Sequence, residues 1–510
     1  MKRALFSAGT LSFAALLLCT CLPHIAVIYL SIILLAVAVT LTIFARRFKW
    51  CFSAVVCLVI CSLLVARFYI VSNEGPESCK ALIGKTATLT ATVTQEPEFN
   101  GENYIYTVTT ESVEYPNSPQ NLKLKLKTNK KLLTIGDTFQ SSVKFYEISA
   151  KYKSSYYGSS FYLFAYPKEI TKTGKTDNFL TFSGKISTEV RKCIVKNLPN
   201  EVSGILIGLI TGGSYYLDDA TYNAFKMCGL SHIISVSGMH MALLSNAIMT
   251  MAALFGLSRR KSFALCLPLL ILYTAISGFS PSAIRSVVMI AAVLCANSFY
   301  LRGDSLNILG GTALAMLVIS PYLIYNLSFL LSVLAMAGIL LSVPVSHKLC
   351  NRINTTYSIG EGIASIIRLA VATVFANFAT LPLVLLVWQG VSTVSVIANI
   401  AISFVVSFCL VFGMVLVLIT MLFGGSGISF LWYPLEYLLW YIRSSAISIS
   451  SIPFSYIKLN LSTLAIICAS IYVALAFYMW LKKTERQRAV RAIGYAGAFA
   501  LFTAAINIIF

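Results

Sequence analysis

The chain has 510 residues, of which 57% are hydrophobic and only 11% are charged, and its mean hydropathy is +0.80. This composition excludes an ordinary soluble globular domain, because many apolar runs reach the roughly 20 residues that cross a bilayer as a helix. The net charge of +20 fits either lysine and arginine retained in cytoplasmic loops or a polyanionic partner such as nucleic acid or anionic lipid. We therefore predict a polytopic α-helical membrane protein.

Residues 1–71 are predicted to form an N-terminal transmembrane anchor of three helices. Its apolar runs are Ala4–Cys21, Ile25–Ala45 and Cys51–Val71. Basic residues precede the first run and the third run, which places the N-terminus in the cytoplasm by the positive-inside rule. The third helix then leads outward, and the polar segment that follows is expected outside the cytoplasm.

Residues 72–180 are predicted to form an extracytoplasmic OB-like β-barrel domain. Apolar and polar residues alternate with the period of a strand in Thr86–Gln95, Tyr104–Thr110 and Leu122–Lys127. Two further strands are expected, one from Ile135 through Phe145 and one at Phe161–Ala165. Five short strands fit a small barrel of the OB type.

A cluster of lysines in this domain is a candidate DNA contact, because OB barrels often bind single-stranded nucleic acid with basic grooves and stacking aromatics. Aromatic residues follow the cluster along the chain. The alternative is that alternating lysines form the solvated face of an edge strand. The lysines are Lys123, Lys125, Lys127, Lys130 and Lys131.

The remaining chain is divided into three parts. Residues 181–200 are predicted to form an amphipathic interfacial helix, because Ile186, Val190 and Ile194 share one stripe. Residues 201–425 are predicted to form the transmembrane core, and residues 426–510 to form C-terminal interfacial and transmembrane helices. The topology of residues 424–460 is left open. The spans expected after the β domain are His232–Leu257, Ser262–Ile276, Ile284–Phe299, Leu306–Ile319, Leu327–Val343, Ile366–Val387, Val394–Phe423, Leu461–Leu481 and Ala492–Phe510.

Three groups of polar residues interrupt the apolar core, where polar side chains are costly and tend to face a cavity or another helix. The first is Gly229–Met241 with the preceding Asp218, and it holds two of the four histidines of the chain. The second is Gly278–Arg285, a broken-helix pattern in which Arg285 is either an interfacial anchor or a phosphate contact. The third is Asn377–Gln389 with the following Asn399. Polar contact between packed helices is the alternative for the first and third groups.

No cofactor and no metal are expected. The sequence has no HxHxDH metal motif and no GxxxxGK[ST] phosphate loop, so an ATP motor on this chain is not expected either.

The three polar groups, in this order after a β domain, resemble the ComEC family of competence proteins, the inner-membrane channels for transforming DNA. The family pattern ending in GLxHLLaiSGlHv resembles Gly204–Met241, and its sPSxxRa element resembles Ser280–Ser286. Its GRxxDxlnxL element resembles Arg302–Asn307, and its later atLPl…Nl element resembles Ala379–Ile400 with Asn399 at the asparagine position.

The chain also departs from the family pattern. The DvGFQLS element appears as Asn326–Ser332, without the acid and the glutamine. Many members carry a C-terminal metallo-β-lactamase-like domain thought to degrade the non-transported strand, whereas this sequence ends in apolar runs. The resemblance therefore implies that any nuclease is a separate polypeptide.

The function implied by the resemblance is a plasma-membrane channel that translocates single-stranded DNA into a bacterial cytoplasm, with no catalytic residues. The implied partners are single-stranded DNA, the lipid bilayer, a DNA receptor, a cytoplasmic DNA-translocation ATPase and a separate nuclease, and a homo-oligomer is left open. The alternatives are a small-solute transporter and an intramembrane serine hydrolase that uses Ser237 with His240. The predicted DNA path or channel core consists of Asp218, His232, Ser235, Ser237, Gly238, His240, Ser280, Pro281, Ser282, Arg285, Asn377 and Asn399.

Overall fold

The computed structural model of the chain describes most residues up to 458. The described ranges are 4–21, 24–45, 49–95, 97–99, 103–115, 121–129, 132–148, 156–176, 178–213, 216–234, 236–279, 281–298, 304–357, 360–423 and 429–458. The last two expected spans, Leu461–Leu481 and Ala492–Phe510, lie outside the described residues.

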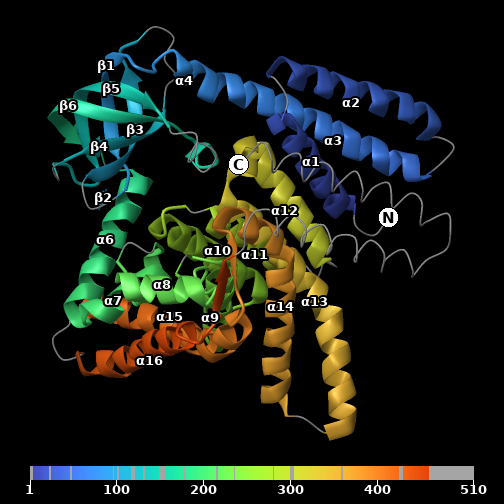
Figure 1. Ribbon diagram of the computed structural model, residues 1–510, viewed down its shortest axis with the longest axis vertical. Coiled ribbons are helices and arrows are strands. Elements are labelled where there is room, and N and C mark those ends of the chain that lie inside the picture. The colour runs from blue at the N-terminus through green and yellow to red at the C-terminus, as the bar shows by residue number, and fades with distance from the viewer. Residues whose placement is uncertain are drawn as a thin grey trace.

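The described part is mostly helical, with one β domain inserted after the first helices (Figure 1). In this view the β domain lies at the upper left, the N-terminal helices lie at the upper right, and α6 leads from the β domain down to the remaining helices. The first helices are α1 (Ala4–Cys21), α2 (His24–Ala45) and α3 (Lys49–Ser72), which coincide with the three predicted apolar runs.

The N-terminal helices are held to the later core by close packing. Gly9 of α1 faces Gly310 of α12 so closely that a Cβ atom at position 9 would lie 2.8 Å from the Gly310 carbonyl oxygen. The pair is typical of helices in membranes, where small residues let backbones approach one another. Leu16, Leu64 and Phe329 belong to the buried cluster that joins α1, α3 and α13.

The β domain is reached through the short turns η1 (Asn73–Glu77) and α4 (Ser78–Lys80). Its sheet runs in the order β1-β5-β6-β4-β3-β2, and β1 also pairs with β3. Only the β4–β6 pairing is parallel. The strands are β1 (Thr86–Val93), β2 (Glu98–Phe99), β3 (Tyr104–Val113), β4 (Lys123–Thr128), β5 (Asp137–Glu147) and β6 (Phe161–Lys175).

The predicted count of five strands is wrong, because the sheet has six. The missed strand β2 has only two residues and is held by its pairing with β3, which leaves no periodic signal in the sequence. Strand β6 is also longer than the expected Phe161–Ala165. Its second half is mostly exposed and polar, so it lacks alternation, yet it pairs with β5 along its length. Tyr106, Phe139 and Phe145 fill the core of the sheet.

Helix α6 (Phe179–Asn197) begins with reciprocal hydrogen bonds between Asn178 and Thr181, a capping arrangement that fixes its first turn. Its predicted apolar stripe packs inward, since Val190 and Ile194 are buried with α7 (Asn200–Thr211). Whether α6 lies at a membrane interface stays a prediction.

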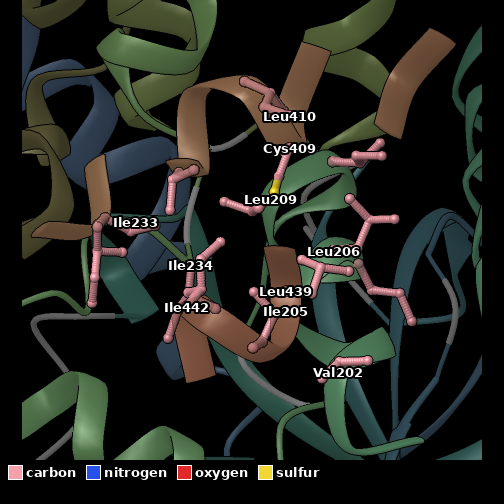
Figure 2. Close-up of a cluster of buried hydrophobic side chains, with 14 of the residues drawn as sticks. Val202, Ile205, Leu206, Leu209, Ile233, Ile234, Cys409, Leu410, Leu439 and Ile442 are labelled. Atoms are coloured by element: carbon pink, nitrogen blue, oxygen red, sulfur yellow. The ribbon is translucent and has the colours of Figure 1, made fainter. Parts of the chain in front are cut away.

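Helix α7 forms the centre of the largest buried cluster. Figure 2 shows Val202, Ile205, Leu206 and Leu209 of α7 among side chains from three other segments. These side chains are Ile233 and Ile234 before α9, Cys409 and Leu410 of α15, and Leu439 and Ile442 of α16.

The middle of the chain contains five helices of moderate length. They are α8 (Asp219–Met227), α9 (Gly238–Leu254), α10 (Arg259–Ile276), α11 (Pro281–Ser298) and α12 (Ser305–Ile319). The break expected near Gly278 lies between α10 and α11, where Gly278 and Phe279 have φ values of 76° and 54°. Pro281 begins α11, where its missing N–H costs nothing.

The prediction that one helix runs from His232 is wrong, because α9 begins only at Gly238. Gly229 has a φ of 71°, and Leu230 and Ile233 are buried in the α7 cluster through an intervening turn. Ser237 is extended, with φ −114° and ψ 172°, and takes the N-cap position.

Within the part of the chain that the structure describes, four helical segments are long and apolar enough to cross a membrane. They are Val55–Lys80, Leu327–Asn351, Glu361–Leu385 and Ser395–Phe423. The last three belong to α13 (Leu327–Tyr357), α14 (Glu361–Trp388) and α15 (Ser395–Phe423), of which α13 and α14 form a hairpin that projects downward in Figure 1. Helices α11 and α12 coincide with expected spans, and α9 covers only the later part of one; they have 18, 15 and 17 residues, respectively.

The open segment 424–460 contains α16 (Trp432–Ser450), which packs against α7, α8 and α15 through buried Trp432 and Leu435. The strands β7 (Gly390–Ser392) and β8 (Tyr456–Lys458) form a two-stranded sheet that joins the ends of α14 and α16. The short turns η2 (Pro321–Tyr325) and η3 (Ser429–Leu431) complete the described elements.

Candidate functional site

The first two polar groups of the sequence meet where α9 begins against α11. We call this cluster the α9 cap, and define it as Ser237, Gly238, His240, Ser282, Arg285 and Ser286. Ser282 Oγ donates to the Val236 carbonyl oxygen at 2.9 Å, which fastens α11 to the residue before the cap. A Cβ atom at Gly238 would lie 3.2 Å from Ser286 Oγ and 3.4 Å from Arg285 Nη2. Glycine therefore lets the guanidinium lie against the first residue of α9.

Arg285 is buried, with 2% of its surface exposed. Its Nη2 donates to Ser286 Oγ at 3.1 Å, and Nη1 lies 3.9 Å from the sulfur of Met289. Its Nε is buried and has no hydrogen-bond partner. Among the residues that the structure describes, no carboxylate forms an ion pair with this guanidinium, so its charge is uncompensated within that part of the chain.

His240 is fully buried in the first turn of α9. Its Nδ1 lies 3.3 Å from the backbone nitrogen of Ser237. Because a backbone N–H can only donate, Nδ1 is the acceptor and the proton of the neutral ring is on Nε2. Nε2 is buried and has no partner among the described atoms. The ring is therefore fixed as a neutral donor, and its Nδ1 is engaged by the backbone of Ser237 rather than by the hydroxyl that a serine hydrolase would activate.

The other residues of the first group lie outside the α9 cap. His232 lies in the preceding turn, with Nδ1 at 3.2 Å from the Gly229 carbonyl oxygen. Asp218 is the N-cap of α8 and pairs with Arg443 of α16 at 3.1 Å. Burial alone would raise the pKa of Asp218, but hydrogen bonds from Thr221 and the ion pair with Arg443 hold the pKa below its ordinary value. Ser235 and Ser280 lie outside the described residues.

The third polar group joins two of the long helices. Asn377 Nδ2 of α14 donates to Ser395 Oγ of α15 at 2.8 Å, and Asn399 Nδ2 of α15 donates to Thr373 Oγ1 of α14 at 2.6 Å. Both asparagines therefore take part in contacts between packed helices. The group lies beside the first one, since a Cβ atom at Gly229 would lie 3.1 Å from the Ser395 side chain.

A second site lies on the β domain, and we call it the lysine–aromatic face. Neighbouring strands place its members on one surface: Lys123, Lys125 and Lys127 of β4, Phe161, Phe164 and Tyr166 of β6, and Lys144 and Tyr146 of β5. Lys125 Nζ lies 5.1 Å from the Phe161 ring centre, and Lys127 Nζ lies 4.4 Å from that of Phe164. The Tyr146 and Tyr166 rings meet edge to face at 5.1 Å. Lys130 and Lys131 lie outside the described residues.

The β domain contacts the helices close to the α9 cap. A Cβ atom at Gly278, in the break before α11, would lie 3.1 Å from Gln95 Nε2 of the β domain. Asn326 Nδ2 donates to Ser159 Oγ at 3.2 Å, while Asn326 Oδ1 accepts from the Phe329 N–H at 3.0 Å. A carboxylate could not donate this bond, although it could accept one from the Ser159 hydroxyl. Where the ComEC pattern has an acid, this chain thus has an asparagine that donates to the β domain.

Sequence reasoning missed several of these residues. Lys144 lies on the strand predicted to end at Phe145 and Tyr146 directly follows that end, so their spacing of two could have added them to the lysine cluster. Ser286 directly follows Arg285 and could have been added for that reason. Arg443 carried no local signal, because its role comes from a contact with Asp218 far away along the chain.

Comparison with known proteins agrees with the motifs. The family described as "Competence protein" matches residues 209–485, which include the α9 cap and the third polar group. The chain is also 25% identical over 242 residues to "ComE operon protein 3" of Bacillus subtilis (strain 168); the match covers 47% of this chain and 29% of that protein. No solved structure matches the chain. Because the family match spans more than half of its residues, the chain belongs to the Competence protein family.

Proposed function

We propose that this chain is a membrane protein of DNA uptake that passes single-stranded DNA across the bacterial plasma membrane. The family and the printed name of the Bacillus relative support a role in competence. The four helical segments of spanning length among the described residues support a membrane location. The β domain, in this proposal, lies outside the cytoplasm and receives the strand.

The β domain has the strand pairings that an OB-like barrel requires. Strand β1 pairs with β5 on one side and β3 on the other, so the pairings β1-β5-β6-β4-β3 return to β1. The parallel contact between β4 and β6 is the remaining link in that ring. We propose that the domain is such a barrel and that β2 extends its edge.

The lysine–aromatic face carries the proposal. Single-stranded nucleic acid is bound by cations that follow the backbone together with aromatic rings that stack on bases. Three adjacent strands here present both kinds of side chain within 4.4–5.8 Å of one another. Lysines on an edge strand would only be solvated, whereas β4 lies between β3 and β6. This placement favours a binding face over the solvated-edge alternative.

The path into the membrane is proposed to continue past Gln95 and Gly278 to the α9 cap. Asn377 and Asn399 would then shape the path by holding α14 to α15. His232 and Asp218 would contribute by positioning the segments before α9 and α8. A DNA receptor, a cytoplasmic ATPase and a separate nuclease are the proposed partners, and single-stranded DNA is the proposed cargo.

The two rival functions are less well supported. In the serine-hydrolase alternative, His240 would have to accept a proton from the Ser237 hydroxyl, but its nearer nitrogen is engaged by the Ser237 backbone. A small-solute transporter would not need a lysine–aromatic face on a β domain.

The test is uptake of fluorescent DNA in a strain from which the gene is deleted. Restoring the gene is expected to restore uptake, and uptake that never depends on the gene would overturn the proposal. For the face itself, oligonucleotide binding to the purified chain is measured against salt concentration. The Lys125→Gln/Lys127→Gln variant is expected to lower the slope of log K against log salt by about 1.4, because each lost single-strand phosphate contact removes about 0.7.

The matched control is Lys192→Gln. Lys192 is an exposed lysine of α6 that pairs with Glu189 at 2.7 Å, away from the face. Its replacement removes one positive charge and is expected to leave the slope unchanged. Because the face variant removes two charges and the control removes one, a decrease in slope about half as large in Lys192→Gln would mean that net charge, rather than the face, governs binding.

A further inference from the structure

The α9 cap concentrates positive charge that nothing described in the chain neutralises. The N-terminus of a long helix carries about half a positive elementary charge from its aligned peptide dipoles. Helix α9 has 17 residues, and the Arg285 guanidinium lies against its first residue. Two positive poles this close inside a protein repel each other, and an anion bound between them would offset that repulsion.

The donors of the cap are also unsatisfied. An arginine side chain stays protonated in proteins, and burying its charge without a partner is strongly unfavourable. Yet Nε of Arg285 and Nε2 of His240 are both buried without an acceptor. The first turn of a helix also leaves backbone N–H groups unpaired. Together with a nearby cationic side chain, these N–H groups can bind an anion. Arg285 and His240 are at least 98% buried, so the missing acceptor cannot be bulk water.

Another arginine, Arg443, also has a buried Nε without a hydrogen-bond partner, but its charge is paired. Arg443 pairs with the Asp218 carboxylate at 3.1 Å. If Arg285 served only to hold helices together, a similar carboxylate would be the expected partner. Instead its hydrogen-bonding partners are a serine hydroxyl and a thioether, both neutral.

We propose that the α9 cap binds one phosphate oxyanion, held by the Arg285 guanidinium, the first N–H groups of α9 and the Nε2–H of His240. Phosphate suits this set because its oxygens accept from a planar guanidinium and from separate N–H donors at once. The claim that this phosphate belongs to DNA passing through the membrane rests on the proposed function. The claim that the cap binds an anion rests only on the contacts of the cap. The phosphate group could belong to nucleic acid or to a lipid headgroup.

The first experiment uses the purified full chain in a maltoside detergent without phosphate. Its unfolding temperature is measured as inorganic phosphate is added, which gives a Kd by linkage. Wild-type protein is expected to gain stability with phosphate, and Arg285→Gln is expected to weaken the Kd about tenfold or more. Because Arg285→Gln removes an uncompensated buried charge, its unfolding temperature without phosphate is expected to equal or exceed that of the wild type.

Two further variants separate binding from structure. Arg443→Gln breaks the ion pair with Asp218, and it is expected to lower the unfolding temperature while leaving the phosphate response intact. Arg285→Lys keeps the charge and is expected to bind phosphate more tightly than Arg285→Gln. A phosphate response of the same size in wild type and Arg285→Gln would overturn the proposal, as would a loss of stability in Arg285→Gln that phosphate does not influence.

The source of the phosphate is resolved by adding an oligothymidylate or phosphatidylglycerol to the same preparations. Stabilisation by the oligonucleotide that Arg285→Gln abolishes assigns the site to nucleic acid, and the same result with the lipid assigns it to a headgroup. Gene-dependent DNA uptake without any phosphate binding would remove the anion site but leave the proposed function. Phosphate binding without gene-dependent uptake would leave the anion site and remove the proposed function.

Discussion

Asp137 is the residue whose titration has the clearest consequence for the β domain. Its carboxylate is almost completely buried, accepts from the Thr134 N–H at 2.8 Å and pairs with Lys172 at 3.0 Å. Burial by itself would raise the pKa of Asp137, but these hydrogen bonds and the lysine hold the pKa below its ordinary value. The charged form is thus favoured in the folded state.

The pH dependence of the β domain follows from that direction. With a folded pKa below the unfolded value of about 3.9, the stabilisation is complete above that value and is lost as the pH falls through the folded pKa. Asp137→Asn is expected to destabilise the domain by about 1–3 kcal/mol at neutral pH, because it removes a charged hydrogen-bonded group. The difference from wild type should shrink as the pH falls below about 4.

Hydrogen exchange of β-domain peptides in nanodiscs measures this difference, with variant and wild type compared at each pH. Glu169→Gln is the control, since Glu169 is exposed on β6. If Asp137→Asn lowers the protection of the β domain from exchange by the same amount at neutral and acid pH, the charge of Asp137 does not contribute to its stability.

At the scale of elements, α13 and α14 depend on a close approach at Gly338. A Cβ atom there would lie 2.5 Å from the Phe375 carbonyl oxygen of α14, a backbone atom that cannot move aside. Gly338→Val is therefore expected to separate the hairpin at a cost of about 1–3 kcal/mol, the usual range for overpacking. Gly362 of α14 has open space around it, so Gly362→Val is a matched control.

Cys350 is a native probe of the same hairpin. It is buried, and its Sγ lies 3.7 Å from the Ala364 carbonyl oxygen of α14. The rate of its alkylation, followed by peptide mass spectrometry, is expected to rise in Gly338→Val and to stay at the wild-type value in Gly362→Val. Unchanged rates in both variants would show that the hairpin tolerates a larger side chain.

Sequence patterns predicted elements where the signal is local. Apolar runs of spanning length located α1, α2, α3, α13, α14 and α15, and the period of two located β1, β3 and β4. Strands β7 and β8 could not be found, because each has three residues and is defined by pairing with a partner far along the chain. The start of α9 was missed because burial of Leu230 and Ile233 in the α7 cluster outweighs the helical appearance of that stretch.

The same distinction applies to the candidate sites. Arg285 and His240 could be singled out because a polar side chain within an apolar run is costly to bury and usually has a functional or packing role. Their meeting in one cap could not be predicted, since it depends on how α9 packs on α11 and on the missing side chain at Gly238. The lysines of β4 were predicted, but the rings that flank them belong to strands whose order in the sheet the sequence does not reveal.

For the whole molecule, the relation between the β domain and the helices decides which compartment the lysine–aromatic face meets. Tyr157 and Tyr162 contact Tyr322 edge to face, and Asn326 bonds Ser159, so the domain is docked on the start of α13. Burial raises the pKa of Tyr157 and of Tyr162 to about 12, so both hydroxyls remain neutral in this contact throughout the physiological range. The β domain is thus held next to the membrane helices rather than hanging from a free linker.

The last prediction concerns the side of the membrane on which the β domain lies. Lys168 is exposed on β6, and Lys261 is exposed at the start of α10. In cells, Lys168→Cys is expected to react with a membrane-impermeant maleimide, whereas Lys261→Cys is expected to react only after permeabilisation. The parent protein serves as the background, because its described cysteines are buried or half-buried. The opposite pattern would place the β domain in the cytoplasm and exclude it as the receiver of incoming DNA.

Labelling of both positions in intact cells would mean that α9 does not cross the membrane. Its 17 residues rise about 26 Å, slightly less than a hydrocarbon core of about 30 Å. In that case the α9 cap would lie on a helix that enters the membrane and returns, and its anion site would face the same compartment as the lysine–aromatic face.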